Sequence, residues 1–339
     1  MFDNKVSHPF NSLFKGSLPQ GTLWSNDDDK LQNDLFIYPI PKQSAELLKS
    51  YKLVIADFSC EHFGDQEGAL PAYFNLLDIG INFIFLTHHE PDHLIMPNYL
   101  FFPHHYFYKN HLILPQVDSV NKVSKQFKIS CLNANSRYHR IYNFLKLRKK
   151  AYFSEMLFTF HNGDAYRHDD PKLDKSIIDE WESLRSEFAN KDSINFNIPD
   201  GENSLPAYTN SYIHLITETT VLKKVFITEK TWKSVASGQL FILLGNPGSI
   251  QHLRNLGVDV FDDYIDHNYY DNEPDWQKRI DKIHDLVGHF MSMPNSFLEQ
   301  INKETQTRRF DNMEKYFTGE FISKYIKCFQ DKVNELSIR

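Results

Sequence analysis

Residues 228–230 place a hydroxyl, an acid and a base side by side where an apolar segment gives way to a helix. In VFITEKTWKSVASGQLFILLG they are Thr228, Glu229 and Lys230. Thr228 suits the N-cap of that helix, whose first N–H groups and dipole favour anions. Lys230 can neutralise a phosphate there, and Glu229 can accept sugar hydroxyls or face a developing positive charge. The dipole favours a glutamate in a first helical turn in any case, so spacing alone leaves the function of the pair open.

A second expected strand–turn–helix unit carries a run of positive charge. Residues 128–150 hold seven Lys and Arg and no Asp or Glu, although the chain has a formal net charge of −7. Arg137 and Arg140 fall in the turn, where a guanidinium can grip phosphate oxygens through two parallel hydrogen bonds. A solvated basic helix face accounts well for residues 146–150. We therefore predict phosphate binding for Arg137 or Arg140.

Two stretches imitate metal-binding motifs. In THHEPDH, residues 87–93, Glu90 stands where binuclear zinc hydrolases have a second histidine, and Pro91 interrupts the pattern. SNDDDK, residues 25–30, resembles the Asp-x-Asp motif of some nucleotide-sugar enzymes, but it follows GTLW in a polar stretch instead of a buried strand. We expect no metal site and no cofactor. His88 or Glu90 can still line a cleft, because ligands gather at the carboxyl ends of strands.

Several function classes lack their motifs. There is no Walker A sequence, no G-x-G-x-x-G and no G-x-S-x-G, which argues against a P-loop NTPase, a dinucleotide oxidoreductase and an α/β-hydrolase. The three cysteines are far apart and odd in number, as in a reducing, cytoplasmic compartment. We see no signal peptide, and the longest apolar runs are too short to span a membrane.

Apolar runs that alternate with amphipathic segments predict an α/β fold with mostly parallel, covered sheets. We expect strands at 35–40, 52–59, 81–88, 127–133, 211–219, 239–245 and 258–263, and helices at 67–80, 137–153, 175–189, 228–238 and 249–257. Thr228 and Ser249 are the expected N-caps, and Gly80, Gly238 and Gly257 the expected helix ends.

A chain of 339 residues exceeds the usual size of one domain, so we predict two. We expect one α/β domain over residues 1–122 and a second, Rossmann-like α/β domain over residues 123–310. Residues 311–339 form a C-terminal helix that packs back on the first domain.

The segments ISCLNANSRYHRIYNFL and FITEKTW…GQLFILLGNPG resemble the donor-binding domain of the α1,3-fucosyltransferase family and its relatives. In that family an aromatic residue and a short apolar step precede Thr-Glu-Lys, a helix follows, and a strand closes in Gly. The similarity covers residues 127–265. It implies a GT-B-like fold, with two Rossmann-like domains facing across a cleft, and an inverting, metal-independent transfer from a nucleotide-diphosphate sugar. On this basis residues 1–122 would be the acceptor-side domain and residues 123–310 the nucleotide-sugar donor-binding domain. Phe226 stands where the family has Tyr, so a hydroxyl typical of the family is missing. The family's contacts to the guanine nucleotide and to fucose have no counterpart that the sequence locates, so neither the base nor the sugar is carried over.

The resemblance also implies roles for single residues. Lys230 and Arg140, with Arg137 as an alternate, would bind the diphosphate. Glu229 would contact the transferred sugar and stabilise its oxocarbenium-like transition state. Glu218, at the end of the strand before the motif, can hold a ribose or sugar hydroxyl, as acidic residues do in Rossmann-like sites.

The family mechanism asks for a carboxylate in the front domain that deprotonates the acceptor hydroxyl. Glu61, directly after the strand at 52–59, is our first choice, ahead of Glu67, Asp57 and Glu90.

The aromatic residues 99–108, with Tyr106 among them, suit two kinds of acceptor. A saccharide can lie on flat rings. A hydroxymethylated pyrimidine in DNA can be flipped and stacked there, with residues 128–150 holding the backbone. Resemblance to uncharacterised glycosyltransferases of tailed phages supports DNA and would place the protein in a host cytoplasm, whereas the negative net charge counts against it. Ordinary packing also explains these aromatics. A third hypothesis is an inactive nucleotide-binding or interaction protein on a transferase-like scaffold.

Overall fold

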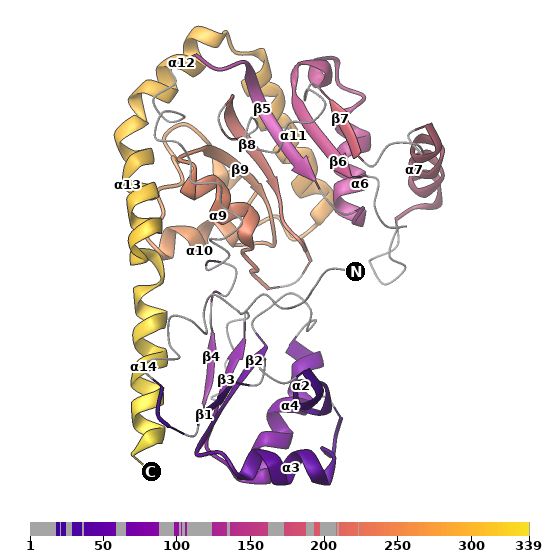
Figure 1. Ribbon diagram of the computed structural model, residues 1–339. Helices are drawn as coiled ribbons and strands as arrows, with labels where there is room; N and C mark the ends of the chain where they lie inside the picture. The colour runs from indigo at the N-terminus through magenta and orange to yellow at the C-terminus, as the bar shows by residue number, and fades with distance from the viewer. Residues whose placement is uncertain are drawn as a thin grey trace. The chain divides into compact units, whose positions relative to one another are not determined.

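The computed structural model describes residues 18–20, 22–24, 29–35, 37–58, 66–87, 98–101, 103, 106, 124–133, 136–161, 173–187, 193–196, 208, 210–222 and 224–338. The chain divides into two compact units, one comprising residues 1–111 and 322–339 and the other residues 112–321 (Figure 1). The sequence places the corresponding limits at 122/123 and 310/311. Both units are α/β, each with its own Rossmann-like sheet, as predicted.

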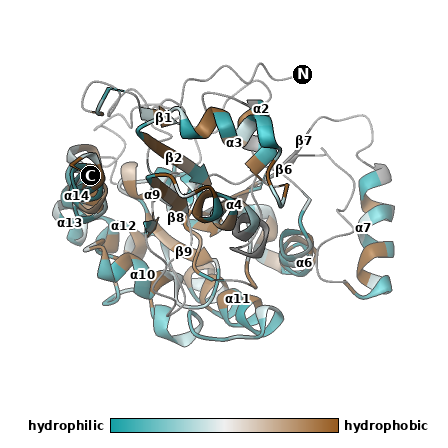
Figure 2. Ribbon diagram, turned by 90° about the horizontal axis from the view of Figure 1, so that it is seen from below, coloured by the Kyte–Doolittle hydropathy of each residue, from teal (hydrophilic) through white to brown (hydrophobic). Residues whose placement is uncertain are grey.

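The first unit is built on a parallel sheet of order β1-β2-β3-β4. Its elements are β1 (Thr22–Trp24), α2 (Asp29–Leu35), α3 (Lys42–Lys49), β2 (Leu53–Phe58), α4 (Gln66–Ile79), β3 (Phe83–Thr87), β4 (Tyr99–Phe101) and α14 (Ser323–Ser337). Every residue of β2 and β3 is buried, as expected for parallel strands covered on both faces, and β2 is coloured as hydrophobic in Figure 2.

Helices cover both faces of this sheet. On one face, Leu31, Leu48 and Tyr73 from α2, α3 and α4 share a core with alternate residues of β2 and β3. On the other face α14 packs against β3 and β4. The ring centroids of Trp24 and Phe329 lie 6.1 Å apart. The helix that follows the second unit in the chain therefore completes the core of the first.

The second unit contains a sheet of order β7-β6-β5-β8-β9, in which only β7 is antiparallel to its neighbour. Its strands are β5 (Phe127–Asn133), β6 (Leu157–His161), β7 (Ser193–Phe196), β8 (Ser211–Thr217) and β9 (Leu240–Leu244). In chain order these strands read 3-2-1-4-5 across the sheet. The order reverses between β5 and β8, which is the switch point where open α/β sheets bind ligands.

The helices of the second unit are α6 (Tyr138–Leu147), α7 (Lys175–Glu187), α9 (Glu229–Ala236), α10 (Ser249–Asn255), α11 (Trp276–Ser292), α12 (Asn295–Glu304) and α13 (Gln306–Thr318), with single 3-10 turns at Ala151–Glu155, His267–Tyr269 and Glu320–Ile322. The crossovers from β5 and β8 run in opposite directions, so right-handed connections place α6 and α9 on opposite faces. Helix α11 packs beside α6, and α13 packs beside α9. The amphipathic α7 shows alternate teal and brown bands in Figure 2.

Most of the predicted elements are confirmed, including α4, α9 and the strands β2, β3, β5, β8 and β9. Thr228 is the N-cap of α9, with its hydroxyl accepting the Lys230 N–H. Gly80, Gly238 and Gly257 follow their helices at φ of 72°, 58° and 86°. These angles favour glycine, which lacks the Cβ that makes them costly.

The strand predicted at 35–40 is wrong. Helix α2 ends at Leu35, and residues 37–40 form bends that include a cis Tyr38–Pro39 peptide bond. The Asn75 side chain on α4 explains the difference, because it donates to the Leu35 and Ile37 carbonyls. Backbone groups that a strand would pair with another strand are thus bonded to a helix side chain.

The strand predicted at 258–263 is also wrong. Asp259 Oδ1 accepts the Phe261 N–H at 2.9 Å, and Asn312 bonds both the N–H and the carbonyl of Asp259. Phe261 has a φ of 63°, which no strand residue adopts. Side chains again satisfy the backbone groups that a ladder would need.

Two smaller expectations also fail. Gly248 stands at the N-cap of α10 in place of Ser249. GTLW is not a polar stretch, because Thr22–Trp24 forms β1 and Trp24 is buried. The sequence argument against a metal motif at 25–30 therefore loses one of its premises, and residues 25–28 lie outside the described residues. No helix among the described residues has both the length and the apolar character needed to cross a membrane.

Candidate functional site

The carboxyl ends of β5 and β8 meet at the switch point of the second sheet. Asn133 ends β5 and Thr217 ends β8. The Thr217 hydroxyl donates to Asn133 Oδ1 at 2.6 Å, and both side chains are buried. Helix α6 starts after β5, and α9 starts after the loop that follows β8. The two predicted strand–turn–helix units are therefore adjacent, and their helix starts are brought to the same edge of the sheet.

Buried basic side chains hold the start of the loop that follows β8. Arg140 on α6 donates from Nη2 to the carbonyls of Thr217 and Glu218, at 3.0 Å each. Arg279 on α11 donates to the Val221 carbonyl. Both arginines are 1% exposed, and burial lowers the pKa of Arg279. Both guanidiniums donate to uncharged carbonyls of this loop and carry positive charge close to the switch point. The nearby carboxylates of Asp271 and Glu273 act on the charge of Arg279.

His139 adds a neutral contact to the same loop. Its Nε2 lies 2.8 Å from the Glu218 carbonyl, which can only accept, so Nε2 carries the proton. Burial, and then the nearby Arg140 guanidinium, hold the pKa of His139 well below its usual value. The imidazole is fully buried. It therefore acts on the loop as a hydrogen-bond donor without adding a charge.

The carboxylate of Glu218 turns inward at the start of this loop. It accepts from the Thr228 N–H at 3.0 Å, from the Thr231 hydroxyl at 2.5 Å and from the Thr228 hydroxyl. Glu218, Thr228 and Thr231 are all 0% exposed. The predicted contact of Glu218 with a ribose or sugar hydroxyl stays a prediction. In the structure this side chain anchors the first turn of α9.

Glu229 and Lys230 stand on that anchored turn with their charged ends within reach of solvent. Glu229 Oε1 and Lys230 Nζ are 2.8 Å apart, and the two side chains are 26% and 21% exposed. Lys230 Nζ also donates to the hydroxyls of Thr219 at 3.3 Å and Thr228 at 3.2 Å. The site therefore presents a lysine, a glutamate and a helix N-terminus together, which suits an anionic group with an attached polar group.

The negative charge of Glu229 affects the pKa values of two neighbouring residues, Lys233 and Tyr208. Burial lowers the pKa of Lys233, which lies one turn along α9, and the Glu229 carboxylate opposes that shift. Burial, Glu229 and Glu218 all raise the pKa of Tyr208. The phenol of Tyr208 is therefore within electrostatic reach of both carboxylates and stays protonated at neutral pH.

The structure brings together five of the residues that the sequence predicts for donor binding: Arg140, Glu218, Thr228, Glu229 and Lys230. Arg137 is the N-cap residue of α6, one turn before Arg140, and is half-buried. Thr219 and Thr231 were missed, although Thr219 directly follows Glu218 in TET and Thr231 ends the segment TEKT. His139 and Arg279 carry no comparable sequence signal.

The predicted acceptor-side residues belong to the first unit. Glu61, His88 and Glu90 lie outside the described residues. Asp57 is fully buried on β2, where it accepts from Trp24 Nε1 at 3.3 Å. Tyr106 is also fully buried. The side chain of Glu67 likewise lies outside the described part.

Acidic side chains from distant helices pair with two of the seven cations in the basic run at 128–150. Lys146 pairs with Asp281 on α11, and Lys149 with Glu180 on α7 at 2.9 Å. Lys128 donates to the Met291 and Met293 carbonyls at the end of α11. The local excess of positive charge in the sequence is therefore partly neutralised in space.

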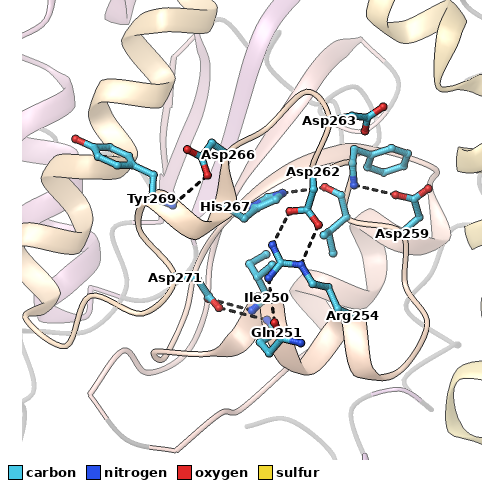
Figure 3. A network of polar contacts seen from close by, with 12 residues as sticks. Ile250, Gln251, Arg254, Asp259, Asp262, Asp263, Asp266, His267, Tyr269 and Asp271 are labelled. Carbon is cyan, nitrogen blue, oxygen red and sulfur yellow. Dashed lines mark hydrogen bonds and ion pairs between the residues drawn. The ribbon is translucent and has the colours of Figure 1, made fainter.

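Acidic residues of the loop after α10 are bonded to α10 itself (Figure 3). Arg254 Nε donates to Asp262 at 2.9 Å, and the Asp271 carboxylate accepts the N–H groups of Ile250 and Gln251 at 3.0 and 3.2 Å. Among the described residues, no group of three or more His, Cys, Asp and Glu is placed to hold a metal ion.

Comparison of the chain with protein-family models, with curated proteins and with solved structures gives no match.

Proposed function

We propose that the protein is a glycosyltransferase that moves a sugar from a nucleotide-diphosphate sugar to an acceptor hydroxyl, with inversion and without a metal ion. One observation carries the proposal. Glu229 and Lys230 stand, partly exposed, on the first turn of α9 at the switch point, and the buried Glu218 carboxylate fixes that turn. The resemblance of this block to the α1,3-fucosyltransferase family supports the same function.

The leaving diphosphate needs positive charge that does not move during the reaction. Lys230, the N-terminus of α9 and the buried guanidinium of Arg140 supply it at one edge of the sheet. Groups held in place before the reaction stabilise developing charge without a cost of reorganisation. This arrangement does for a diphosphate what a divalent cation does in other transferases.

The sugar itself becomes positively charged in the transition state. In the proposed reaction the acceptor oxygen attacks the anomeric carbon, the bond from that carbon to the phosphate oxygen breaks, and the acceptor proton passes to a carboxylate. Glu229 faces the oxocarbenium-like sugar, and its neighbour Lys230 holds the phosphate. For the proton acceptor, Glu61 remains the choice that the sequence suggests.

Donor binding is the first test. Thermal-shift measurements with UDP-, GDP-, ADP- and TDP-sugars should show stabilisation by one nucleotide class, since a ligand that binds only the folded state raises the melting temperature. Lys230→Ala should weaken that donor at least about tenfold, because it removes a charged contact to phosphate. Lys303→Ala, at an exposed position on α12, is the matched control. If none of the four classes stabilises the protein, the proposal fails.

Turnover is the second test. Glu229→Gln should lower the rate of transfer by about a hundredfold or more while leaving nucleotide binding nearly unchanged, because the negative charge matters mainly in the transition state. Full activity in this variant would remove Glu229 from the mechanism. Donor binding without transfer to any acceptor would favour the inactive nucleotide-binding alternative.

The acceptor class, a saccharide or a hydroxymethylated pyrimidine in DNA, needs its own measurement. Phosphate contacts make the affinity for DNA fall steeply with salt. The ion pairs of Lys146 and Lys149 leave less unpaired charge for a DNA backbone than the sequence suggests. A titration of modified duplex and single-stranded DNA at increasing salt, beside an array of saccharides, separates the two.

A further inference from the structure

Glu218, Thr228 and Lys230 form a chain of hydrogen bonds with a fixed direction. A carboxylate only accepts and an ammonium only donates, so the hydroxyl between them has one possible orientation. The Thr228 hydroxyl donates to Glu218 Oε2, and its lone pairs receive Lys230 Nζ at 3.2 Å and the Lys230 N–H at 3.4 Å. The carboxylate at the buried end thus determines which way the hydroxyl faces the lysine.

The ammonium group of Lys230 has a defined set of partners. Its three protons match three acceptors: the hydroxyls of Thr219 and Thr228 and the carboxylate of Glu229. Two of these contacts are to uncharged hydroxyls at 3.2 Å or more, so they orient the ammonium without neutralising its charge. The Lys230 side chain is 21% exposed, so it is not sealed off from solvent.

Water does not compete for the buried end of this chain. Glu218 and Thr228 are 0% exposed, and the two carboxylate oxygens receive one backbone N–H and two hydroxyls. Hydrogen bonds at such depth are costly to leave unmade. The orientation of the Thr228 hydroxyl is therefore set by the protein.

We propose that Glu218 is a positioning residue that aims the ammonium group of Lys230 at the donor diphosphate by orienting the Thr228 hydroxyl. We call the hydrogen bonds from Lys230 to the Thr228 hydroxyl and from that hydroxyl to Glu218 the relay; it is a property of the folded protein. Its consequence for catalysis rests on the proposed glycosyltransferase function. Glu218 acts through its neighbours and needs no contact with substrate.

Glu218→Gln changes the direction of the relay while keeping the size of the side chain. The carbonyl of the new amide must face the Thr228 N–H, which can only donate, so the NH2 group is left facing the Thr228 hydroxyl. That hydroxyl then receives the amide N–H and loses its acceptor, and its own proton competes with the ammonium of Lys230. The variant should free Lys230 from one of its partners.

The two threonines bound to Glu218 give a matched pair of variants. Thr228→Val and Thr231→Val each remove a buried hydroxyl bound to the same carboxylate, but only the Thr228 hydroxyl contacts Lys230. Thr228→Ser keeps the hydroxyl and should restore wild-type behaviour. Because Thr228 is also the N-cap of α9, Thr228→Val loses the cap together with the contact to Lys230. Glu218→Gln keeps the Thr228 hydroxyl and therefore separates the two effects.

Competitive acetylation of the whole chain tests the relay without any substrate, because the labelling rate of Lys230 depends on how firmly its ammonium group is held. The labelling rate of Lys230, read by mass spectrometry relative to the exposed Lys303, should rise about fivefold in Glu218→Gln, the effect of one lost hydrogen bond. It should rise similarly in Thr228→Val and stay unchanged in Thr231→Val and Thr228→Ser. An unchanged rate in both Glu218→Gln and Thr228→Val overturns the proposal, as does an equal rise in Thr231→Val.

Donor affinity then links the relay to function. With the nucleotide sugar that stabilises the wild type, Kd should rise about fivefold in the two variants that release Lys230 and not in the two controls. Changed labelling without donor binding by the wild type would refute the glycosyltransferase and keep the relay. Donor binding by the wild type with unchanged labelling in the variants would refute the relay and keep the proposed glycosyltransferase function.

Discussion

Arg140 joins α6 to the end of β8: its Nη2 lies 3.0 Å from the carbonyl oxygens of both Thr217 and Glu218. This contact crosses the switch point, because α6 follows β5 and the carbonyls belong to the neighbouring strand end. The side chain is 1% exposed, so its hydrogen bonds are made in the interior. The resemblance assigns the same residue to the diphosphate. These two roles lead to different expectations for one variant.

Arg140→Lys keeps the charge and removes the planar fork of donors. If the tie to the two carbonyls is the main role, the free energy of unfolding should fall by about 2 kcal/mol, the cost of buried acceptors left without a partner. Urea denaturation measures this, with Arg148→Lys at an exposed position as the control. Unchanged stability combined with lost donor binding would identify Arg140 as a direct phosphate ligand.

Four buried histidines make the second unit sensitive to acid. Burial lowers the pKa of His214 to about 3 and those of His267 and His284 to about 4, and His139 is shifted in the same direction. Below about pH 6.5 the unfolded chain binds protons that the folded state excludes. Stability should therefore be full above that pH and fall towards pH 4, by about 1.4 kcal/mol per pH unit for each histidine.

Urea denaturation at a series of pH values between 7.5 and 5 tests this dependence. His284→Gln offers a specific check, because a glutamine amide can still donate to Asn143 Oδ1 as His284 Nε2 does at 2.8 Å. This variant should lose less stability on acidification than the wild type. Identical pH profiles for the two proteins would contradict the assignment of His284 as a buried neutral group.

The α10 helix takes its N-terminal cap from a distant carboxylate. Asp271 accepts the N–H groups of Ile250 and Gln251, as Figure 3 shows, and Gly248 at the N-cap has no side chain to do so. Asp271→Ala should lower the free energy of unfolding by about 1–2 kcal/mol, the usual value of a cap. Asp281→Ala, which removes one surface ion pair, should cost less than about 1 kcal/mol. Equal losses in the two variants would argue against capping by Asp271.

The two lysines of the run at 128–150 that form ion pairs should contribute little to binding of a polyanion. Lys146 and Lys149 already pair with Asp281 and Glu180. Changing both lysines to glutamine should leave the salt dependence of DNA affinity nearly unchanged, because few counterions are released at charges that are already paired. A slope that falls by about two, one for each lysine, would show that both residues contact phosphates.

The sequence correctly predicts those helices and strands that are determined by residues close together in the chain. Buried parallel strands such as β2 and β3 are mainly apolar runs, with Asp57 and Thr87 near their carboxyl ends, and Gly80 marks the end of α4. The segment at 35–40 has the same apolar appearance, yet its backbone is bonded by Asn75, forty residues from Leu35. Ser249 looks like a cap, but the carboxylate that caps α10 comes from Asp271. Such partners are set by the fold and are invisible to a window of sequence.

The same distinction applies to the candidate site: residue types are visible in the sequence, but contacts between distant residues are not. The sequence identifies Glu229 and Lys230 because type and spacing alone place an acid and a base at a helix start. It also finds Glu218 but cannot show that this carboxylate turns inward onto Thr228 and Thr231. The tie made by Arg279 to the loop after β8 comes from a helix far along the chain and has no local signature.

The chain leaves the first unit, builds all of the second, and returns as α14 to cover β3 and β4. Until α14 has been synthesised, Trp24 lacks Phe329 and Phe101 lacks Tyr325, whose ring centroid lies 4.9 Å from its own. A ribosome therefore completes the second unit before the first, so the second unit is expected to fold first. Until then one face of the first sheet is uncovered, and exposed apolar surface of this kind makes a nascent chain prone to aggregation.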